Sequence, residues 1–168
     1  MKHLINISLL VLIIPVLVST HSLADTKSHA ADKSYIKDAM RKMDTATQRK
    51  DLNGYLVFLH RDYTDVNQAG VVTAHNKIQM REQMSQMFVR ATSITLGPTT
   101  VTRFVFDKQG ATVYEGGSLS MTLIISGRVS VIQAGGTYQD FWVKTATGWL
   151  KKRSSSVSST TTLNGKPV

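Results

Sequence analysis

The order of hydrophobic patterns along the chain predicts an α+β fold, in which three N-terminal helices pack on a strongly curved, mixed and mainly antiparallel sheet. Two observations support this prediction. Apolar residues recur at helical spacing in the first half of the chain, and strand-forming residues alternate with polar ones in the second half. The expected order is helix, helix, strand, strand, helix and then four strands. A strongly bent sheet cannot lie flat against helices, so we expect a cone with an internal pocket.

The first 24 residues carry the pattern of a secretory signal peptide. Lys2 and His3 precede the apolar run 4–18, and Ser22-Leu23-Ala24 places small residues where a signal peptidase cleaves. A membrane anchor is the alternative, but a run of about 15 residues is shorter than the roughly 20 that span a bilayer. We therefore expect cleavage after Ala24 and a periplasmic or secreted protein without a membrane anchor. The remaining chain is expected to divide into a flexible leader (25–33), one domain (34–159) and a flexible tail (160–168).

The composition limits the chemistry that the chain can perform. It has no cysteine, so it can form neither a disulfide nor a thiolate metal site. The histidines after the signal peptide stand at no ligand spacing, and we expect no metal and no cofactor. The formal net charge is +9, but the basic residues are scattered except at Lys151-Lys152-Arg153. We interpret that cluster as a solvated strand face, with a binding patch as the alternative, and an exported protein is not expected to bind nucleic acid.

Three helices are predicted before residue 92. The first runs from Ser34, an N-cap candidate, to about Lys50, and the second runs from Leu52 to about His60. Thr73 is the expected cap of the third helix. The buried stripes of the first and third helices are predicted at Ile36, Ala39, Met40, Met43, Ile78 or Met80, Met84, Met87, Phe88 and Ala91.

Strands are predicted on both sides of the third helix. The stretch DYTDVNQAG (62–70) has the pattern of a short strand that ends in a turn, and a brief strand follows at 71–73. Later strands are expected at 94–106, 111–126, from 128 to 142 and beyond, and at 149–159. Apolar and polar residues alternate within 111–126, which indicates that one face of the sheet is buried.

Two segments carry a resemblance to a known family: KDLNGYLVFLHRDYTDVNQAG, and YQDFWVKTATGWLKKRS across the last hairpin. The chain from Tyr35 to about Ser158 resembles the nuclear transport factor 2-like, or SnoaL-like, superfamily, which includes ketosteroid isomerase. The resemblance implies the cone fold, a ligand pocket between sheet and helices, and a homodimer formed through the exposed face of the sheet.

Ketosteroid isomerases remove a proton next to a carbonyl with a strand carboxylate, and hold the enolate oxygen with a tyrosine and a protonated aspartic acid. The resemblance places the base at Asn67, whose amide cannot accept that proton, and the tyrosine at Met43, which has no hydroxyl. Only the aspartic acid is matched, by Asp140. Isomerase activity is therefore not expected.

Asp65 and Asp140 are the candidate catalytic residues. A strand's period of two places Tyr63, Asp65 and Asn67 on one face, so Asp65 is either a displaced base or a strand residue bonded to neighbouring groups such as backbone or an arginine. Asp140 is either a pocket acid, whose pKa an apolar environment raises, or the partner of a basic strand neighbour. The sequence leaves both choices open.

The expected pocket lining consists of Tyr63, Asn67, Met43, Met84, Phe88 and Trp142. Methionine side chains on inward stripes can line an adaptable apolar pocket, although such a stripe can also be core. The favoured function is an exported domain that binds a small apolar or amphipathic ligand, or a protein partner. The alternative is a cavity enzyme of isomerase, cyclase or hydratase type that uses Asp65 or Asp140, and the third possibility is a dimerising assembly module.

Overall fold

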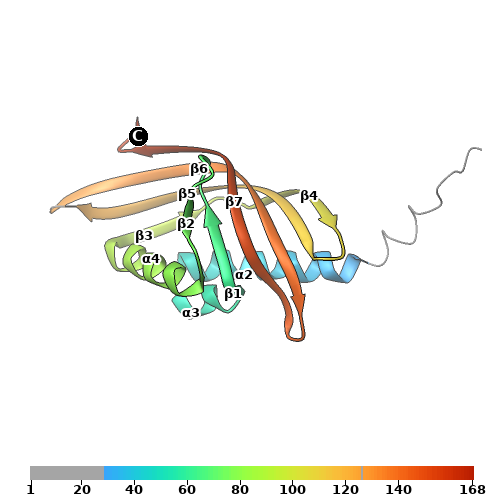
Figure 1. The fold of residues 1–168 in the computed structure, drawn as a ribbon. Helices are drawn as coiled ribbons and strands as arrows, with labels where there is room; N and C mark the ends of the chain where they lie inside the picture. The colour runs from blue at the N-terminus through green and yellow to red at the C-terminus, as the bar shows by residue number, and fades with distance from the viewer. Residues whose placement is uncertain (1–28, 126) are drawn as a thin grey trace, which may run out of the picture.

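The computed structural model describes residues 29–125 and 127–168, so the predicted signal peptide and residues 25–28 of the leader lie outside the described residues. The predicted fold class is confirmed: helices at the N-terminus are followed by a curved, mostly antiparallel sheet (Figure 1). The elements are α2 (Ala30–Gln48), α3 (Leu52–Leu56), β1 (Leu59–Val66), β2 (Val72–Ala74), α4 (Lys77–Arg90), β3 (Ala91–Leu96), β4 (Thr100–Phe106), β5 (Ala111–Ile125), β6 (Arg128–Thr145), β7 (Gly148–Leu163) and β8 (Lys166–Pro167). No helix among the described residues is long and apolar enough to cross a membrane.

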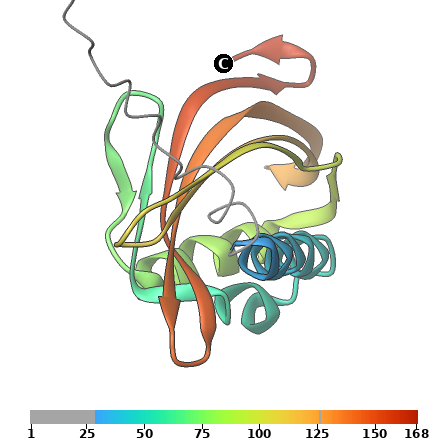
Figure 2. The ribbon, with the colours of Figure 1, turned by 90° about the vertical axis from the view of Figure 1, so that its right-hand side faces the viewer.

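The sheet is mixed because its β1 and β7 strands run parallel, whereas the other paired strands are antiparallel. The strand order is β2-β1-β7-β6-β5-β3, with β4 also on β5 and β8 on β7. Register shifts in the β1–β7 and β6–β7 pairs add local bends. Figure 2, which views α2 along its axis, shows the long strands curling over the helices. One face of the sheet therefore covers the helices and the other faces outward.

The edge of β5 carries two strands in succession. β3 pairs with the second half of β5, and β4 pairs with the first half of β5. Residues 97–99 connect β3 to β4. The single strand expected at 94–106 is thus two strands, because Gly97 and Pro98 interrupt the pairing. This interruption leaves the edge of the sheet open beside α2.

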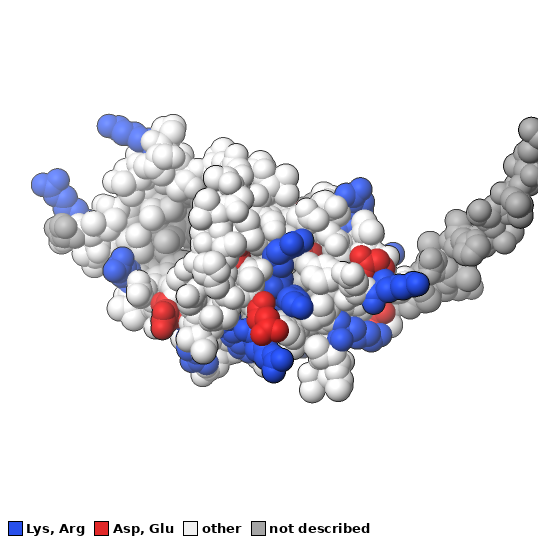
Figure 3. Space-filling model, in the orientation of Figure 1, with Lys and Arg blue, Asp and Glu red and all other residues white. Residues whose placement is uncertain are grey.

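Apolar side chains fill the space between the helices and the sheet in two clusters. The larger cluster includes Ile36 of α2 with Trp142 and Trp149 of the β6–β7 hairpin, and the smaller includes Phe88 of α4 with Met121 of β5. In α2 the buried positions follow the spacing that the sequence predicted for the first helix. The basic side chains, in contrast, are spread over the face in Figure 3 and do not gather into one patch.

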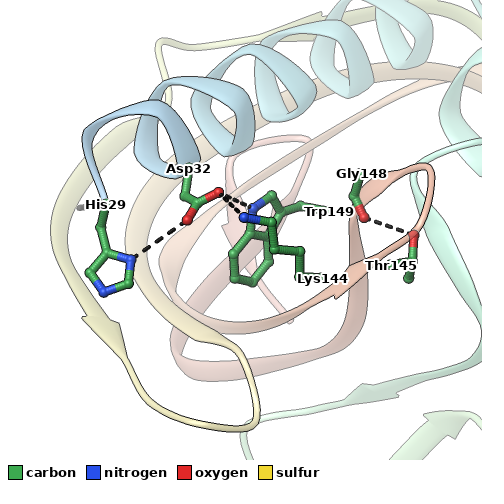
Figure 4. Close-up of polar contacts among 6 residues, drawn as sticks. All are labelled: His29, Asp32, Lys144, Thr145, Gly148 and Trp149. Carbon is green, nitrogen blue, oxygen red and sulfur yellow. Dashed lines mark hydrogen bonds and ion pairs between the residues drawn. The ribbon is translucent and has the colours of Figure 1, made fainter.

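The first turn of α2 is bound to the β6–β7 hairpin (Figure 4). Asp32 Oδ1 accepts hydrogen bonds from Trp149 Nε1 at 2.8 Å and from Lys144 Nζ at 2.9 Å. The ring of His29 stacks on Phe106 at a centroid distance of 4.1 Å, and its Nδ1 lies 3.6 Å from Asp32 Oδ2. We call Asp32, Lys144 and Trp149 the anchor cluster. These contacts explain why the helix begins at Ala30 and not at the expected Ser34.

Other element ends also differ from the predictions. Asn76, and not Thr73, caps α4: its Oδ1 accepts from the backbone N–H groups of Ile78 and Gln79. The second helix ends at Leu56, and His60 lies in β1. The expected flexible tail instead extends β7 to Leu163 and forms β8, because the long β6 strand offers pairing partners as far as residue 132.

Candidate functional site

Three ionisable side chains lie together on the concave face of the sheet, one on each of three adjacent strands. They are Glu115 of β5, Asp140 of β6 and Lys151 of β7, and we call them the central cluster. Lys151 Nζ contacts Asp140 Oδ2 and lies 3.9 Å from Glu115 Oε1. It also lies 5.4 Å from the centroid of the Trp142 ring. Asp140 is fully buried, so the lysine neutralises a carboxylate that water cannot reach.

The pairing of the strands explains why these residues meet. Glu115 lies opposite Tyr138 on β6, and Trp142 lies opposite Lys151 on β7. Side chains two apart share a face, so Glu115 follows the buried Val113 on the concave side. The same rule places Lys151 beside Trp149.

Burial determines the protonation of the cluster. It raises the pKa of Glu115 to about 8, and the neighbouring Asp140 carboxylate acts in the same direction while Lys151 opposes it. The Glu115 carboxyl therefore stays neutral near pH 7 and can donate a hydrogen bond. Burial alone would lower the pKa of Lys151, but above all the carboxylate of Asp140 holds it above its ordinary value. Lys151 is a permanent cation and not a nucleophile.

Tyrosine hydroxyls extend this polar interior. Burial raises the pKa of Tyr55 to about 12 and that of Tyr63 well above its ordinary value, so both keep their protons. Tyr63 Oη donates to Asp65 Oδ1 at 3.2 Å, and Thr73 Oγ1 donates to Asp65 Oδ2 at 2.6 Å. The structure thus favours the interpretation of Asp65 as a strand residue bonded to its neighbours, although the partners are hydroxyls and not the backbone or arginine groups expected.

A cavity of about 240 Å³ opens onto Glu115. Its wall also includes Asp44 of α2, Thr99 of the β3–β4 connection and Tyr138 of β6. Thr99 Oγ1 donates to Asp44 Oδ2 at 2.8 Å, and burial raises the pKa of Asp44. Asp44, Glu115 and Tyr138 give this cavity a hydrogen-bonding end, which we call its inner end, while Leu96 and Leu119 give it apolar surface.

A second cavity of about 480 Å³ adjoins the first and shares Asp44 and Thr99 with it. It lies between α2 and the interrupted edge of the sheet, and Met40, Leu96 and Val101 give it an apolar surface. The basic residues at its wall are Lys37 and Arg41 of α2. The two cavities together combine apolar surface with the hydrogen-bonding groups at the inner end.

The structure brings some of the sequence-predicted site residues together and separates others. Tyr63, Asp65 and Asp140 belong to one polar interior, because both carboxylates contribute to the raised pKa of Tyr63. Asn67 is exposed, and its Oδ1 caps the turn after β1 by accepting from the N–H groups of Ala69 and Val71. The expectation that Asn67 faces the cavity is therefore wrong, because the strand ends at Val66 and the chain turns there.

The other expected lining residues are packed side chains. Met43 and Trp142 lie in the larger core cluster, Phe88 lies in the smaller one, and Met84 is partly buried against both. None of Tyr63, Asn67, Met43, Met84, Phe88 and Trp142 lines either of the two cavities beside Asp44. For the methionines, the core alternative is what the structure favours.

Sequence reasoning missed Asp44, Glu115 and Lys151. Lys151 was assigned to a solvated face, yet it is buried. The alternation of Trp149 and Lys151 on one face was the available signal, and the alternation of Val113 and Glu115 was another. For Asp44 there was no comparable signal, because it lies at the border of the apolar stripe of α2.

No protein-family model matches the chain, and no curated protein matches it either. Solved structures do. A ketosteroid isomerase-like protein from Erwinia carotovora atroseptica is 19% identical, with a TM-score of 0.57 over 74% of this chain and 95% of that protein. A nuclear transport factor 2-like protein with a cystatin-like fold from Novosphingobium aromaticivorans is 14% identical, with a TM-score of 0.55 over 83% and 90% of the two chains.

An enzyme is also among these neighbours. A hexachlorocyclohexane dehydrochlorinase of type 2 is 11% identical, with a TM-score of 0.64 over 85% of this chain and 93% of that enzyme. At such identities the likeness concerns the backbone and not the reaction. The resemblance in fold expected from the sequence is confirmed: the chain has the cone fold of nuclear transport factor 2-like and ketosteroid isomerase-like proteins.

Proposed function

We propose that this protein is an exported domain that binds a small amphipathic molecule in the two adjoining cavities between α2 and the sheet. The observation that carries the proposal is the combination of apolar surface and hydrogen-bonding groups in these cavities. Met40, Leu96 and Val101 supply apolar surface in the larger cavity, and Glu115 and Tyr138 line the inner end of the smaller one. A concave, mainly apolar space with a few convergent polar groups is the usual form of a small-molecule site.

The inner end favours a hydrogen-bonding group on the ligand. Glu115 is neutral near pH 7 because burial raises its pKa to about 8, so it can donate to a carbonyl or hydroxyl oxygen. Asp44, which also lines this cavity, offers acceptor oxygens. The apolar part of the ligand would then lie along α2 against Met40 and Val101.

A cavity enzyme is the second candidate, and the pKa of Glu115 favours it. A general acid works best when its pKa lies near the working pH, and Glu115 meets that condition inside a cavity. Asp44, which lines the same cavity, is the candidate base. The candidate acid and base are therefore Glu115 and Asp44. The carboxylates of Asp65 and Asp140 are instead bonded to Tyr63, Thr73 and Lys151.

Filling the cavity tests the binding proposal. A Cβ added at Gly117, which lines the smaller cavity, has Thr99 Oγ1 at 4.0 Å as its near neighbour, so the Cβ of Gly117→Val fits there and its methyl groups would occupy the cavity. The matched control is Thr122→Val on the opposite face of β5. We expect the affinity for the neutral amphipathic dye Nile red to fall about tenfold or more in Gly117→Val and to stay unchanged in the control.

Native mass spectrometry of the purified protein complements the dye. A small molecule that remains bound to the parent and to Thr122→Val, but not to Gly117→Val, would identify a ligand of the cavity. Equal dye binding in all three proteins would contradict the proposal. Conversion of that molecule by the parent and not by Glu115→Gln would favour the enzyme over the binding domain.

A further inference from the structure

The hairpin that joins β5 to β6 ends in exposed aliphatic side chains. Ile124 is 56% exposed, Ile125 is 46% exposed and Val129 is 69% exposed. Ile124 pairs with Val129 and Ile125 with Arg128, so these side chains are gathered at the end of one two-stranded ribbon. The ribbon projects beyond the helices at one end of the molecule (Figure 1).

The end of α4 lies beside this hairpin. Ala91, directly after the helix, pairs with Leu123, which brings Val89 and Arg90 next to the end of β5. Val89 is 83% exposed. We call Val89, Arg90, Ile124, Ile125, Arg128 and Val129 the hairpin tip.

The charge of the hairpin tip is of one sign. Arg90 and Arg128 are its charged residues, and the segments 87–93 and 121–132 contain no Asp or Glu. Figure 3 shows blue and no red at the end of the hairpin. Four exposed aliphatic side chains and two guanidinium groups therefore share one narrow end of the molecule.

We propose that the hairpin tip docks on the surface of an anionic phospholipid bilayer. Ile124, Ile125 and Val129 would enter the boundary between headgroups and acyl chains, while Arg90 and Arg128 pair with lipid phosphates. This site is separate from the cavities beside Asp44, so the proposal does not depend on the proposed ligand.

The shape of the hairpin tip favours a bilayer over a protein partner. A stable protein interface buries about 800 Å² on each partner, usually over a broad and closely packed surface. A projecting ribbon end offers a few aliphatic side chains instead, which suits shallow insertion into a deformable lipid surface. The arginines complement the negative potential of anionic headgroups and have no acidic neighbours in these two segments to compete for them.

Vesicle co-sedimentation tests the proposal directly. The chain beginning at Asp25 is used, because it keeps every contact described for residues 29–168 and omits the apolar run 4–18. We expect it to sediment with vesicles of equal parts phosphatidylcholine and phosphatidylglycerol, not with phosphatidylcholine alone, and to dissociate in about 0.5 M NaCl.

Two double variants test the aliphatic and the charged side chains of the hairpin tip separately. Ile125→Ser with Val129→Ser removes the aliphatic contact, and Arg90→Gln with Arg128→Gln removes the charge; each should weaken vesicle binding by about tenfold or more. Val57→Ser, at a valine that is 60% exposed between α3 and β1, is the control and should bind like the parent. Circular dichroism verifies that each variant is folded.

Several results would overturn the proposal. They are equal binding by the parent and both tip variants, equal loss in Val57→Ser, and no binding to anionic vesicles by the folded parent. A dimer seen by light scattering that the tip variants dissociate, without vesicle binding, would assign the hairpin tip to a second copy of the chain instead.

Discussion

The anchor cluster and the central cluster each place a lysine near a carboxyl group, but the pKa of that carboxyl shifts in opposite directions in the two. In the anchor cluster, Lys144 is largely exposed, and the hydrogen bonds from Lys144 and Trp149 lower the pKa of Asp32. In the central cluster, burial dominates and raises the pKa of Glu115 to about 8 despite the nearby Lys151. The difference shows that a nearby lysine does not by itself decide whether a carboxyl is ionised, because burial raises the pKa of Glu115 although Lys151 opposes that shift.

The two clusters should also differ in how much they contribute to stability. An exposed ion pair contributes little, because water solvates both partners almost as well when they separate. A buried pair gives a modest net gain when it forms, but the loss of one partner leaves a charge without solvent or counter-ion. Changes in the central cluster should therefore be far more costly than changes in the anchor cluster.

The largest effect is expected for Lys151→Met. This change leaves the carboxylate of Asp140 buried without its cation, which should lower the free energy of unfolding by about 3–5 kcal/mol. Urea unfolding at pH 7 measures it. The control is Lys152→Met at the next residue, which is less buried and should change stability by no more than about 0.5 kcal/mol. Similar losses of stability in both variants would mean that the broken Lys151–Asp140 pair does not cause the destabilisation of Lys151→Met.

The next effect is a pH dependence that Glu115→Gln removes. The ordinary pKa of a glutamic acid is 4.5, and in the folded protein that of Glu115 is about 8. Between these values the folded state holds a proton that the unfolded state has lost, so the contribution of Glu115 to stability is complete below pH 4.5 and declines as pH rises to 8.

Glutamine cannot ionise, so the stability of Glu115→Gln relative to the parent should increase as pH rises from 5 to 8. Denaturant unfolding at several pH values measures this difference. Glu82→Gln changes an exposed glutamate of α4 and should show no such trend. A pH-independent difference for Glu115→Gln would contradict the assignment of its raised pKa.

The smallest effect is expected for Asp32→Asn in the anchor cluster. The amide can still accept from Trp149, so the loss at pH 7 should be about 1 kcal/mol or less and should shrink at high salt. The folded pKa of Asp32 is lowered, so its contribution is present above its ordinary pKa of 3.8 and is lost as pH falls through the lower folded value. Unfolding at pH 7 and at pH 3 checks both statements, and a loss comparable to that of Lys151→Met would break the comparison.

The periodicity of the sequence was sufficient to predict the fold class. The helical stripe through Ile36, Met40 and Met43 and the alternation in β5 follow from local patterns, and both are present in the structure. The start of α2 could not be predicted in the same way, because Asp32 is held by partners 112 and 117 residues away. Local pattern does not reveal a partner that distant in the chain.

The candidate site was less accessible to sequence reasoning. Lysine usually favours solvent, so Lys151 was placed on an exposed face, and its burial depends on which strand lies beside β7. Strand pairing also brings Glu115 and Asp140 together, and the register shifts in β6–β7 cannot be read from composition. Export through a signal peptide and dimerisation through the sheet stay predictions.

The protonation of Glu115 is tested most directly by its titration in the folded protein, followed by NMR of its side-chain carboxyl carbon. We expect a pKa near 8, because burial beside Asp140 outweighs the attraction of Lys151. A carboxyl titration near pH 8 that is absent from Glu115→Gln belongs to Glu115. A value near the ordinary 4.5 would contradict the central claim, because the inner end of the cavity would then present an ionised carboxylate and no hydrogen-bond donor at that position.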